Sequence, residues 1–403
     1  MSTNEAINKP SGERSVYFIT GSTGLMGSEF VYEVLNNSRS SECILLIRAD
    51  TKIKIESRLD ALMLYLFPDK ELFIEMRKRV KAVRGDVGSK QLGMSDDDWE
   101  WVSKSTNYIL HAAALTDWGA NIKDATKVNV FGVKEVISLA YSCRPNLKKF
   151  IHISSAYVSG SRVGNISPND INVIEHACDN YQISKIQGEN LVRREWSKLP
   201  ITIVRPGAVV GNSNNGRTPT YKTFYYPLQM LYNGLPLVLP VKKHGNTEAV
   251  PSDWAAKVMF HMMLDETTNG DCYHLTNGSQ VLTNSEIKKI VYKAFNDLGE
   301  NPKRSWYIPY VVYDLVASRL IKSRVPNGES LDEKVRLYRH YMTYRRLFDN
   351  TSTLEFTDKK DISLPGFGDY LHVLMDYAIQ DKWYRKREVL TKRFNRSKSN
   401  QVV

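Results

Sequence analysis

Residues 16–27 have the sequence VYFITGSTGLMG, which predicts a buried β-strand, a glycine-rich turn and the start of a helix. VYFIT (16–20) is a short apolar run, as expected for a strand that is covered on both faces. Gly21, Gly24 and Gly27 follow at intervals of three residues. Since glycine lets the backbone turn tightly, this segment is typical of the first strand-to-helix turn of an α/β fold.

The alternation of strand and helix continues along the chain. Apolar runs of the same type predict six further strands, at 43–47, 80–87, 107–113, 148–155, 199–206 and 272–276. Helical patterns lie between them, at 24–36, 53–66, 71–79, 121–142 and 179–197. Strand–helix–strand units at this spacing form right-handed crossovers, so they predict an α/β fold with a doubly wound parallel sheet of the Rossmann type.

The pattern loosens after Pro206. A polar loop is expected at 211–220, helices at 222–234 and 251–264, and a mostly helical region from 283 to about 390. We expect this last region to form a helical cap. The expected boundaries are 14–212 and 248–280 for the Rossmann domain, 213–247 and 281–385 for the cap, and 386–403 for a partly flexible basic tail.

Composition excludes several classes of protein. The chain has 403 residues, of which 42% are hydrophobic and 25% charged, an ordinary globular balance. It contains no apolar run of about 18 residues, and its N-terminus is polar, so we expect a cytoplasmic protein without a membrane-spanning helix. Its four cysteines are scattered without a C-x-x-C pair, which predicts neither a disulfide framework nor a metal site.

Part of the net charge of +11 is concentrated near the C-terminus, where residues 382–398 are strongly basic. Such a segment is most often a solvated helix end, and it also suits peripheral contact with anionic lipid or with an acidic carrier protein. We expect no nucleic-acid partner, and the sequence leaves the oligomeric state open.

The glycine turn is suited to binding a dinucleotide. Glycine allows close approach to a pyrophosphate, and the N-terminus of the following helix presents N–H groups and a positive dipole to the anion. The residues expected at this site are Gly21, Ser22, Thr23, Gly24, Leu25, Met26 and Gly27. Arg48, at the end of the second strand, suits the 2′-phosphate of NADPH, while the nearby Asp50 leaves NADH open. Arg58 is interpreted as a second phosphate ligand or as an exposed helix charge.

Two further strand ends add candidate cofactor contacts. Asp86 and Val87, after the third strand, are placed to meet the adenine. Ala112 and Ala113, after the fourth, are small where a cofactor must pass, although strand-end packing explains them equally well. His111, just before them, is expected to be a core histidine with a hydrogen-bond partner.

Tyr181 and Lys185 are four residues apart, which places both on one face of the predicted helix 179–197. A nearby ammonium stabilises a phenolate, so we expect Lys185 to lower the pKa of Tyr181 and make it a general acid–base. Ser155 ends a strand at the sheet edge where ligands of open α/β sheets bind, and its hydroxyl is suited to hold a carbonyl oxygen.

These segments together resemble the extended short-chain dehydrogenase/reductase superfamily. The similarity rests on TGSTGLMG, HAAALTDW, NVFG, HISSAYV, YQISK and IVRPGAVVG. IRAD, RLDALMLYLF, KRVKAVRGDV, LGMSDDDW, RPGAVVGNSNNG and AVPSDWAAKV are similar to its male-sterility and thioester-reductase branch, which includes fatty acyl-CoA reductases. The resemblance implies catalytic roles for Ser155, Tyr181 and Lys185.

The resemblance also implies roles for two other positions. Asn129, in NVFG, would support the lysine through water, and Pro206 and Gly207, after Arg205, would form a turn beside the nicotinamide. The larger thioester reductases of the branch follow a carrier domain, so the acyl group is expected here on coenzyme A or on a separate acyl carrier protein.

The sequence therefore predicts an NADPH-dependent reductase of acyl thioesters that yields an aldehyde or an alcohol. Residues 211–220 and 222–247 are expected to line an apolar substrate pocket. Three alternatives stay open: a carbonyl reductase or hydroxyl dehydrogenase acting on a sterol-like or polyketide molecule, a sugar-nucleotide epimerase, and a catalytically silent NADP-binding protein.

Overall fold

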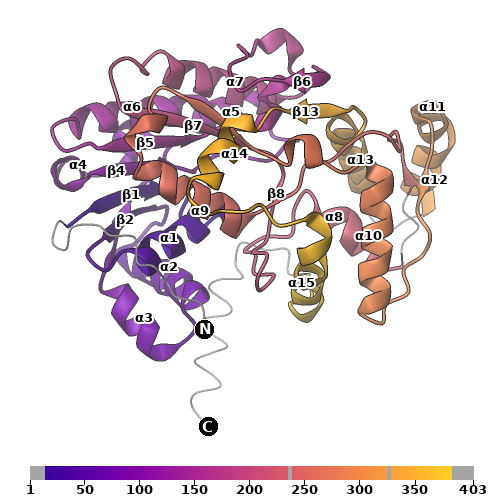
Figure 1. Cartoon of the computed structure of the whole chain (residues 1–403), viewed down its shortest axis with the longest axis horizontal. Helices are drawn as coiled ribbons and strands as arrows, with labels where there is room; N and C mark the ends of the chain where they lie inside the picture. Colours follow the sequence, from indigo (N-terminus) through magenta and orange to yellow (C-terminus); the bar gives the residue numbers. More distant parts are fainter. Residues whose placement is uncertain (1–13, 235–237, 325–327, 384–403) are drawn as a thin grey trace.

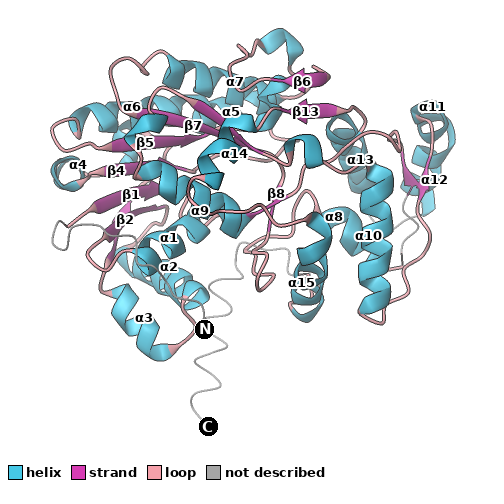
Figure 2. Ribbon diagram, viewed as in Figure 1, coloured by secondary structure: helices cyan, strands magenta, loops and turns pink. Residues whose placement is uncertain are grey.

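The computed structural model describes residues 14–234, 238–324 and 328–383. A seven-stranded sheet forms its centre, with strands in the order β11-β7-β5-β4-β1-β2-β3 (Figures 1 and 2). All six neighbouring pairs are parallel. The strands are β1 (Val16–Thr20), β2 (Glu42–Ile47), β3 (Val80–Arg84), β4 (Tyr108–His111), β5 (Lys149–Ile153), β7 (Ile201–Pro206) and β11 (Cys272–Leu275). The predicted doubly wound parallel sheet is confirmed.

Helices cover both faces of the sheet, because its strands are apolar on both sides. On one face, α1 (Leu25–Asn37), α2 (Lys52–Leu66) and α9 (Ser252–Met263) share one apolar cluster with the strands. On the other, α4 (Asp96–Ser105), α6 (Gly132–Ser142) and α7 (Asn180–Arg193) share a second cluster. The strand order reverses between β1 and β4, and a crevice opens at the carboxyl ends of the strands beside such a reversal.

Two local features differ from the prediction. The single helix expected at 121–142 is divided into α5 (Ile122–Thr126), a π-helical turn over Lys127–Phe131, and α6. The helix α4 was not predicted, although Ser95 accepts a hydrogen bond from the backbone of Asp98 and three acidic residues fill the first turn, both ordinary helix-start signals.

A second body of helices lies beside the sheet, at the right of Figure 1. A third apolar cluster joins α8 (Tyr225–Tyr232), α10 (Asn284–Asp297) and α15 (Phe367–Gln380). Helices α11 (Tyr310–Val312), α12 (Ser318–Arg324) and α13 (Gly328–Met342) also belong to it, whereas α3 (Lys70–Arg77) packs against α2 and α14 (Thr351–Asp358) against β11. The basic segment from residue 384 onward lies outside the described residues.

Short parallel strands fasten this second body together, which the expectation of a mostly helical region did not include. The pairs are β6 (Gly164–Ile166) with β13 (Arg346–Phe348), β8 (Val209–Val210) with β10 (Val250–Pro251), and β9 (Val238–Leu239) with β12 (Trp306–Tyr307). The first pair ties the segment before α14 to the loop that precedes α7.

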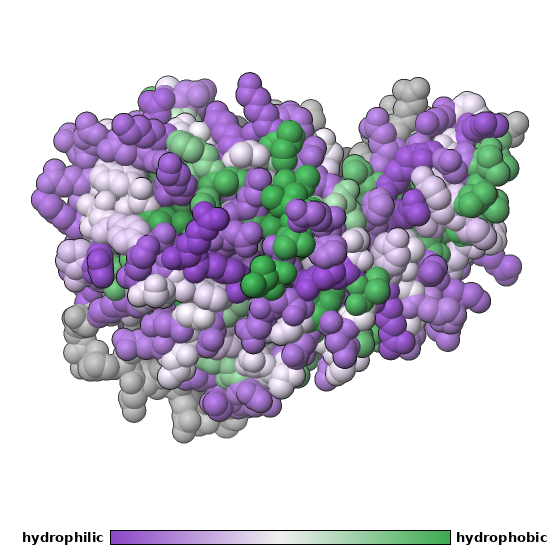
Figure 3. Space-filling view, turned by 90° about the horizontal axis from the view of Figure 1, so that it is seen from above, coloured by the Kyte–Doolittle hydropathy of each residue, from purple (hydrophilic) through white to green (hydrophobic). Residues whose placement is uncertain are grey.

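The surface carries one group of exposed apolar side chains at the far end of the second body, where α11 and α12 lie. They are Val311, Val312, Leu315, Val316 and Leu320, and Figure 3 shows green hydrophobic residues at this end of the molecule. Among the helices of the described part of the chain, none has both the length and the apolar character needed to cross a bilayer.

Candidate active site

The glycine turn is built so that only glycine fits at two positions. Gly21 has φ of +70°, and a Cβ there would lie 2.6 Å from the backbone carbon of Ala112. A Cβ on Gly27 would lie 2.3 Å from the carbonyl oxygen of Gly21. Helix α1 begins just after Gly24, whose position supplies no side-chain cap to the first N–H groups. These N–H groups are therefore available to an anion in the crevice.

A cleft of about 1590 Å³, open solvent at its mouth included, lies above the carboxyl ends of the strands. The candidate residues that line it are Gly21, Thr23, Gly24, Leu25, Met26, Gly27, Ala112, Ser155, Tyr181, Lys185, Pro206 and Gly207. The other candidate residues are not among the described residues that line the cleft: Ser22, Arg48, Arg58, Asp86, Val87, Ala113 and Asn129. The structure thus brings the glycine turn together with the three candidate catalytic residues, Ser155, Tyr181 and Lys185. The remaining candidate residues lie outside the cleft lining.

Ser155, Tyr181 and Lys185 converge on this cleft from two elements. Ser155 follows β5, where its hydroxyl accepts a hydrogen bond from the backbone N–H of Tyr157 at 3.2 Å. Tyr181 lies in the first turn of α7 and shares a side-chain hydrogen bond with Ser155. The Lys185 Nζ, one turn further along, donates to the carbonyl oxygen of Ile153 at 2.7 Å.

The expected effect of Lys185 on Tyr181 is wrong for this arrangement. Burial raises the pKa of Tyr181 to about 12, and the hydrogen bond from Ser155 only partly opposes that rise. Burial also lowers the pKa of Lys185 to about 8. The ammonium faces the Ile153 carbonyl, so burial outweighs any attraction between it and the phenolate. At neutral pH the phenol keeps its proton and is ready to donate it.

Two buried histidines lie beneath Lys185. The Nδ1 of His111 is 2.8 Å from the hydroxyl of Thr20, so the prediction of a core histidine with a partner is confirmed. His152 stacks on His111, with ring centroids 5.4 Å apart. Burial, and then the Lys185 charge, lower the pKa of both histidines, that of His111 to about 3. Both rings are therefore neutral at physiological pH.

Asn129 lies in the π-helical turn and makes three hydrogen bonds. Its Oδ1 accepts from the backbone N–H of Leu115 at 2.8 Å, and its Nδ2 donates to the Leu115 carbonyl and to the hydroxyl of Ser184. Both amide hydrogens are thus used within the protein, one of them by Ser184, the residue before Lys185. The support of Lys185 by Asn129 through water stays a prediction. Asn129 holds the loop after β4 against the helix that carries Tyr181.

Arg48, Arg58 and Asp86 form a group at the outer edge of the sheet. Arg48 is exposed and lies 3.6 Å from the Asp86 carboxylate. The Arg58 guanidinium donates to the carbonyl oxygen of Arg48, so the two arginines flank the end of β2. Ser22 and Val87 are buried, and the partly buried Ala113 packs against the apolar cluster on the same face as Val87. The Ala113 N–H donates to the Thr20 hydroxyl at 3.2 Å.

A buried ion pair next to the site was not predicted. The Glu189 carboxylate in α7 accepts two hydrogen bonds from Arg205 in β7, at 2.6 and 3.0 Å, and both side chains are at most 2% exposed. Glu189 also accepts from Ser154, beside Ser155, and from Arg193. Burial would raise the pKa of Glu189, but Arg205 holds it well below its ordinary value. The pair fixes the helix of Tyr181 to the sheet.

A second buried carboxyl was also missed. Glu248 lies against Gly207, where an added Cβ would be 2.7 Å from the Glu248 Cβ. Its Oε2 accepts from the Asn277 N–H at 2.8 Å, whereas its Oε1 has no hydrogen-bond partner among the described residues. Burial raises the pKa of Glu248 to about 8, against the opposing effect of Asn277. The carboxyl is therefore mostly protonated at neutral pH.

A Glu248→Gln variant is expected to be more stable than the wild type in alkaline solution. The unfolded carboxyl ionises from about pH 4.5, whereas the folded one keeps its proton until about pH 8, so the wild type loses stability over this interval. The variant should match the wild type near pH 4.5 and exceed it by about 4 kcal/mol at pH 8. Urea unfolding at the two pH values measures this, and a difference that does not grow with pH would contradict it.

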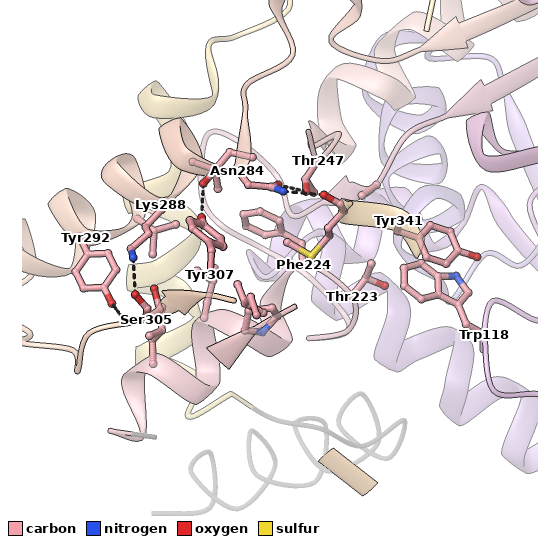
Figure 4. A pocket seen from close by; sticks show the side chains of 18 of the residues that line it. Trp118, Thr223, Phe224, Thr247, Asn284, Lys288, Tyr292, Ser305, Tyr307 and Tyr341 are labelled. Carbon is pink, nitrogen blue, oxygen red and sulfur yellow. Dashed lines mark hydrogen bonds between the residues drawn. The ribbon is translucent and has the colours of Figure 1, made fainter. Parts of the chain in front are cut away.

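An apolar chamber of about 790 Å³, open solvent at its mouth included, adjoins the cleft. The two cavities share Trp118, Tyr157, Ala208 and Thr223. Much of its wall is apolar and consists of Phe224, Leu228, Leu231 and Leu239 with Ile287, Val291 and Tyr292 of α10. Trp118 and Tyr341 stack at one end, with ring centroids 3.6 Å apart (Figure 4). Part of the segment 222–247 therefore lines a cavity, and its role as a substrate pocket stays a prediction.

The polar loop 211–220 contributes less to the cavities than expected. Pro219 and Thr220 line the cleft. Ser213 and Asn214 instead hold the Asp253 carboxylate, and Arg217 pairs with the buried Glu29 at 3.1 Å. Most of the loop therefore fastens α1 and α9 together rather than facing a substrate.

Comparison with known proteins identifies a family and several relatives of this chain. An NAD-binding family model described as male sterility protein matches residues 19–259. "Fatty acyl-CoA reductase wat" of Drosophila melanogaster is 26% identical over 286 residues, 62% of this chain and 54% of that protein. The "L-2-aminoadipate reductase large subunit" of Penicillium chrysogenum is 26% identical over 363 residues, 85% of this chain and 24% of that protein.

A solved structure shares the whole fold. The terminal R domain from the myxalamid PKS-NRPS biosynthetic pathway superposes with a TM-score of 0.79 at 20% identity, over 93% of this chain and 92% of that one. The chain spans about half the length, or less, of the curated relatives named above.

Proposed function

The chain belongs to the male sterility protein family, and on that premise we propose that it reduces acyl thioesters with a nicotinamide cofactor. The observation that carries the proposal is the joining of two cavities. One holds the glycine turn with Ser155, Tyr181 and Lys185, and the other is an apolar chamber that opens from it. A dinucleotide suits the first, and an acyl chain suits the second.

The residues of the cleft have distinct tasks in this reaction. The nicotinamide, when bound, supplies a hydride to the thioester carbonyl carbon. Ser155 and Tyr181 hold the oxygen on which negative charge develops, and the Tyr181 hydroxyl gives it a proton. Collapse of the resulting hemithioacetal breaks the carbon–sulfur bond and releases an aldehyde and a thiol. A second hydride transfer would yield the alcohol.

The protonation states of Tyr181, Lys185 and the two histidines at neutral pH suit the direction of reduction. With a pKa raised to about 12, Tyr181 is a phenol at neutral pH and serves as the acid rather than the base. Lys185, with a pKa lowered to about 8, is still mainly an ammonium, and we assign to it the ribose of the cofactor. The two neutral histidines below add no positive charge that would compete with it.

The test is incubation of the protein with NADPH and a panel of acyl-CoA thioesters. We expect oxidation of NADPH with stoichiometric release of free coenzyme A thiol, and an aldehyde or alcohol identified by mass spectrometry. Turnover of apolar ketones without any thiol release would support a carbonyl reductase instead. An acyl carrier protein loaded with the same chains tests whether the natural donor is coenzyme A or a carrier.

The proposed cofactor is NADPH. The support is the pair of guanidinium groups of Arg48 and Arg58 at the end of β2, where the adenosine ribose of a dinucleotide would lie. Arg48 is exposed, with Asp86 as a weak partner at 3.6 Å, so its charge is available to a 2′-phosphate.

Replacing Arg48 with alanine is expected to raise the KM for NADPH by about 10- to 100-fold and to leave the KM for NADH nearly unchanged, because only NADPH carries the 2′-phosphate. Steady-state rates with each cofactor at saturating acyl-CoA measure the effect. Lys104→Ala removes an exposed cation from α4 and serves as the control. An equal loss with both cofactors would contradict the role given to Arg48.

A further inference from the structure

The far end of the apolar chamber carries a positive charge. Among the described residues that line the chamber, Lys288 is the one charged side chain. In Figure 4 it lies with Tyr292 and Ser305 at the end opposite Trp118 and Tyr341. Trp118 also lines the cleft of Tyr181, so Lys288 faces the part of a bound substrate that is remote from the reacting carbonyl.

The ammonium of Lys288 has aromatic neighbours and a carbonyl but no counter-ion. Its Nζ donates to the carbonyl oxygen of Ser305 and lies 5.1 Å from the ring centre of Tyr307 and 5.9 Å from that of Tyr292. Burial lowers its pKa, and no carboxylate is among the causes. Within residues 14–234, 238–324 and 328–383, Lys288 forms no ion pair. A partly buried cation without a counter-ion attracts an anionic ligand that enters the chamber.

The neighbouring hydroxyls do not compete for a ligand. The Tyr307 hydroxyl donates to the Asn284 carbonyl at 2.6 Å. The Tyr292 hydroxyl donates to the Lys303 carbonyl and accepts from the Ser305 N–H, both at 2.7 Å. The two rings are thereby fixed on either side of Lys288. An ammonium has three N–H donors, and Ser305 accepts one of them, so the described surroundings leave donors for an incoming acceptor.

We propose that Lys288 binds a carboxylate at the end of the acyl chain remote from the thioester, so that the chamber selects acyl groups with an acidic terminus over plain ones. The inference rests on the proposed thioester reduction, since it assigns the chamber to the acyl chain. The apolar wall accommodates the methylene groups between the two ends. The ammonium then supplies a charge-assisted hydrogen bond at a fixed depth.

The experiment compares two thioesters of equal length, dodecanoyl-CoA and the mono-CoA thioester of dodecanedioic acid. The wild type should prefer the second. Lys288→Met keeps the length of the side chain without its charge, and it is expected to lower kcat/KM for the carboxylated substrate by about 10- to 100-fold. The same variant should leave the plain substrate unchanged or improved. Lys288→Arg should retain the preference to within a few-fold.

The matched control is Lys289→Gln, which removes the next lysine of α10, an exposed residue outside the chamber lining. This control variant should leave kcat/KM unchanged for both substrates. An equal loss with both substrates in Lys288→Met would assign Lys288 to the common coenzyme A moiety and overturn the proposal. An unchanged kcat/KM of Lys288→Met with both substrates would overturn the proposal as well.

A binding measurement separates this inference from the proposed function. If the wild type turns over neither thioester, the proposed function fails, and calorimetric titration with monomethyl dodecanedioate and methyl dodecanoate still tests the chamber, because only the first carries a free carboxylate. We expect the wild type to bind the half-ester about 10- to 100-fold more tightly than Lys288→Met does, with methyl dodecanoate little affected. Equal binding of the half-ester by wild type and variant would overturn the inference independently of catalysis.

Discussion

Replacing Tyr181 with phenylalanine is expected to lower kcat for thioester reduction by about 10²- to 10⁴-fold, the usual contribution of a positioned general acid. The hydroxyl both holds the developing oxyanion and supplies its proton, and the burial that raises its pKa to about 12 keeps that proton in place at neutral pH. Phenylalanine retains the ring and its packing in the first turn of α7. Single-turnover oxidation of NADPH with a saturating acyl-CoA measures the loss.

Two measurements separate this catalytic loss from a structural one. The affinity for NADPH should be unchanged within about three-fold, since the glycine turn and Lys185 are intact, and the unfolding midpoint in urea should move little. Ser184→Ala is the matched control, because Ser184 lies on the same helix and its hydroxyl bonds Asn129 and the Tyr181 carbonyl rather than the cleft. Tyr181→Phe with wild-type kcat would refute the proposed acid.

The sheet and the convergence of Tyr181 with Lys185 are predictable from the sequence because their signals are local. A glycine turn after the apolar run at 16–20 requires close backbone approach, which the contact of Gly21 with Ala112 demonstrates. A spacing of four residues places two side chains on one helix face wherever that helix packs. Both arguments hold without knowledge of distant residues.

The electrostatics of the same pair are not predictable in this way. Lys185 donates to the carbonyl of Ile153, 32 residues earlier in the chain, and burial then decides the pKa of both members. The spacing alone predicts a lowered pKa for Tyr181, whereas burial in the fold raises it. The direction depends on which groups the fold buries beside it, and no local pattern encodes that.

The chamber is beyond sequence reasoning for a similar reason. Its walls meet from segments more than 200 residues apart, with Trp118 stacked on Tyr341 and the Tyr341 hydroxyl bonded to Asp179 at the start of α7. Lys288 lies in a segment that the pattern predicts only as helix.

A signal was present in hindsight at Arg205, a charged residue inside an apolar strand, which requires a buried partner.

That buried partner, Glu189, is the basis of the second large effect. Glu189→Gln is expected to lower the free energy of unfolding by about 3–5 kcal/mol, because it leaves the Arg205 guanidinium buried without its counter-charge. Since Arg205 holds the pKa of Glu189 below its ordinary value, the wild-type advantage should be full above the ordinary glutamate pKa. It should be lost in stronger acid, as the folded protein takes up the proton.

Urea unfolding of wild type and Glu189→Gln at neutral and acidic pH measures this difference, and Asp297→Asn is the matched control. Asp297 pairs with Lys293 at 2.6 Å on the surface of α10, where both side chains are more than half exposed, so its loss should change stability by less than about 1 kcal/mol. A small effect at Glu189 equal to that at Asp297 would mean that water reaches the pair. In that case the helix of Tyr181 would have to be held to the sheet by its apolar contacts and by the hydrogen bonds of Asn129 and Lys185.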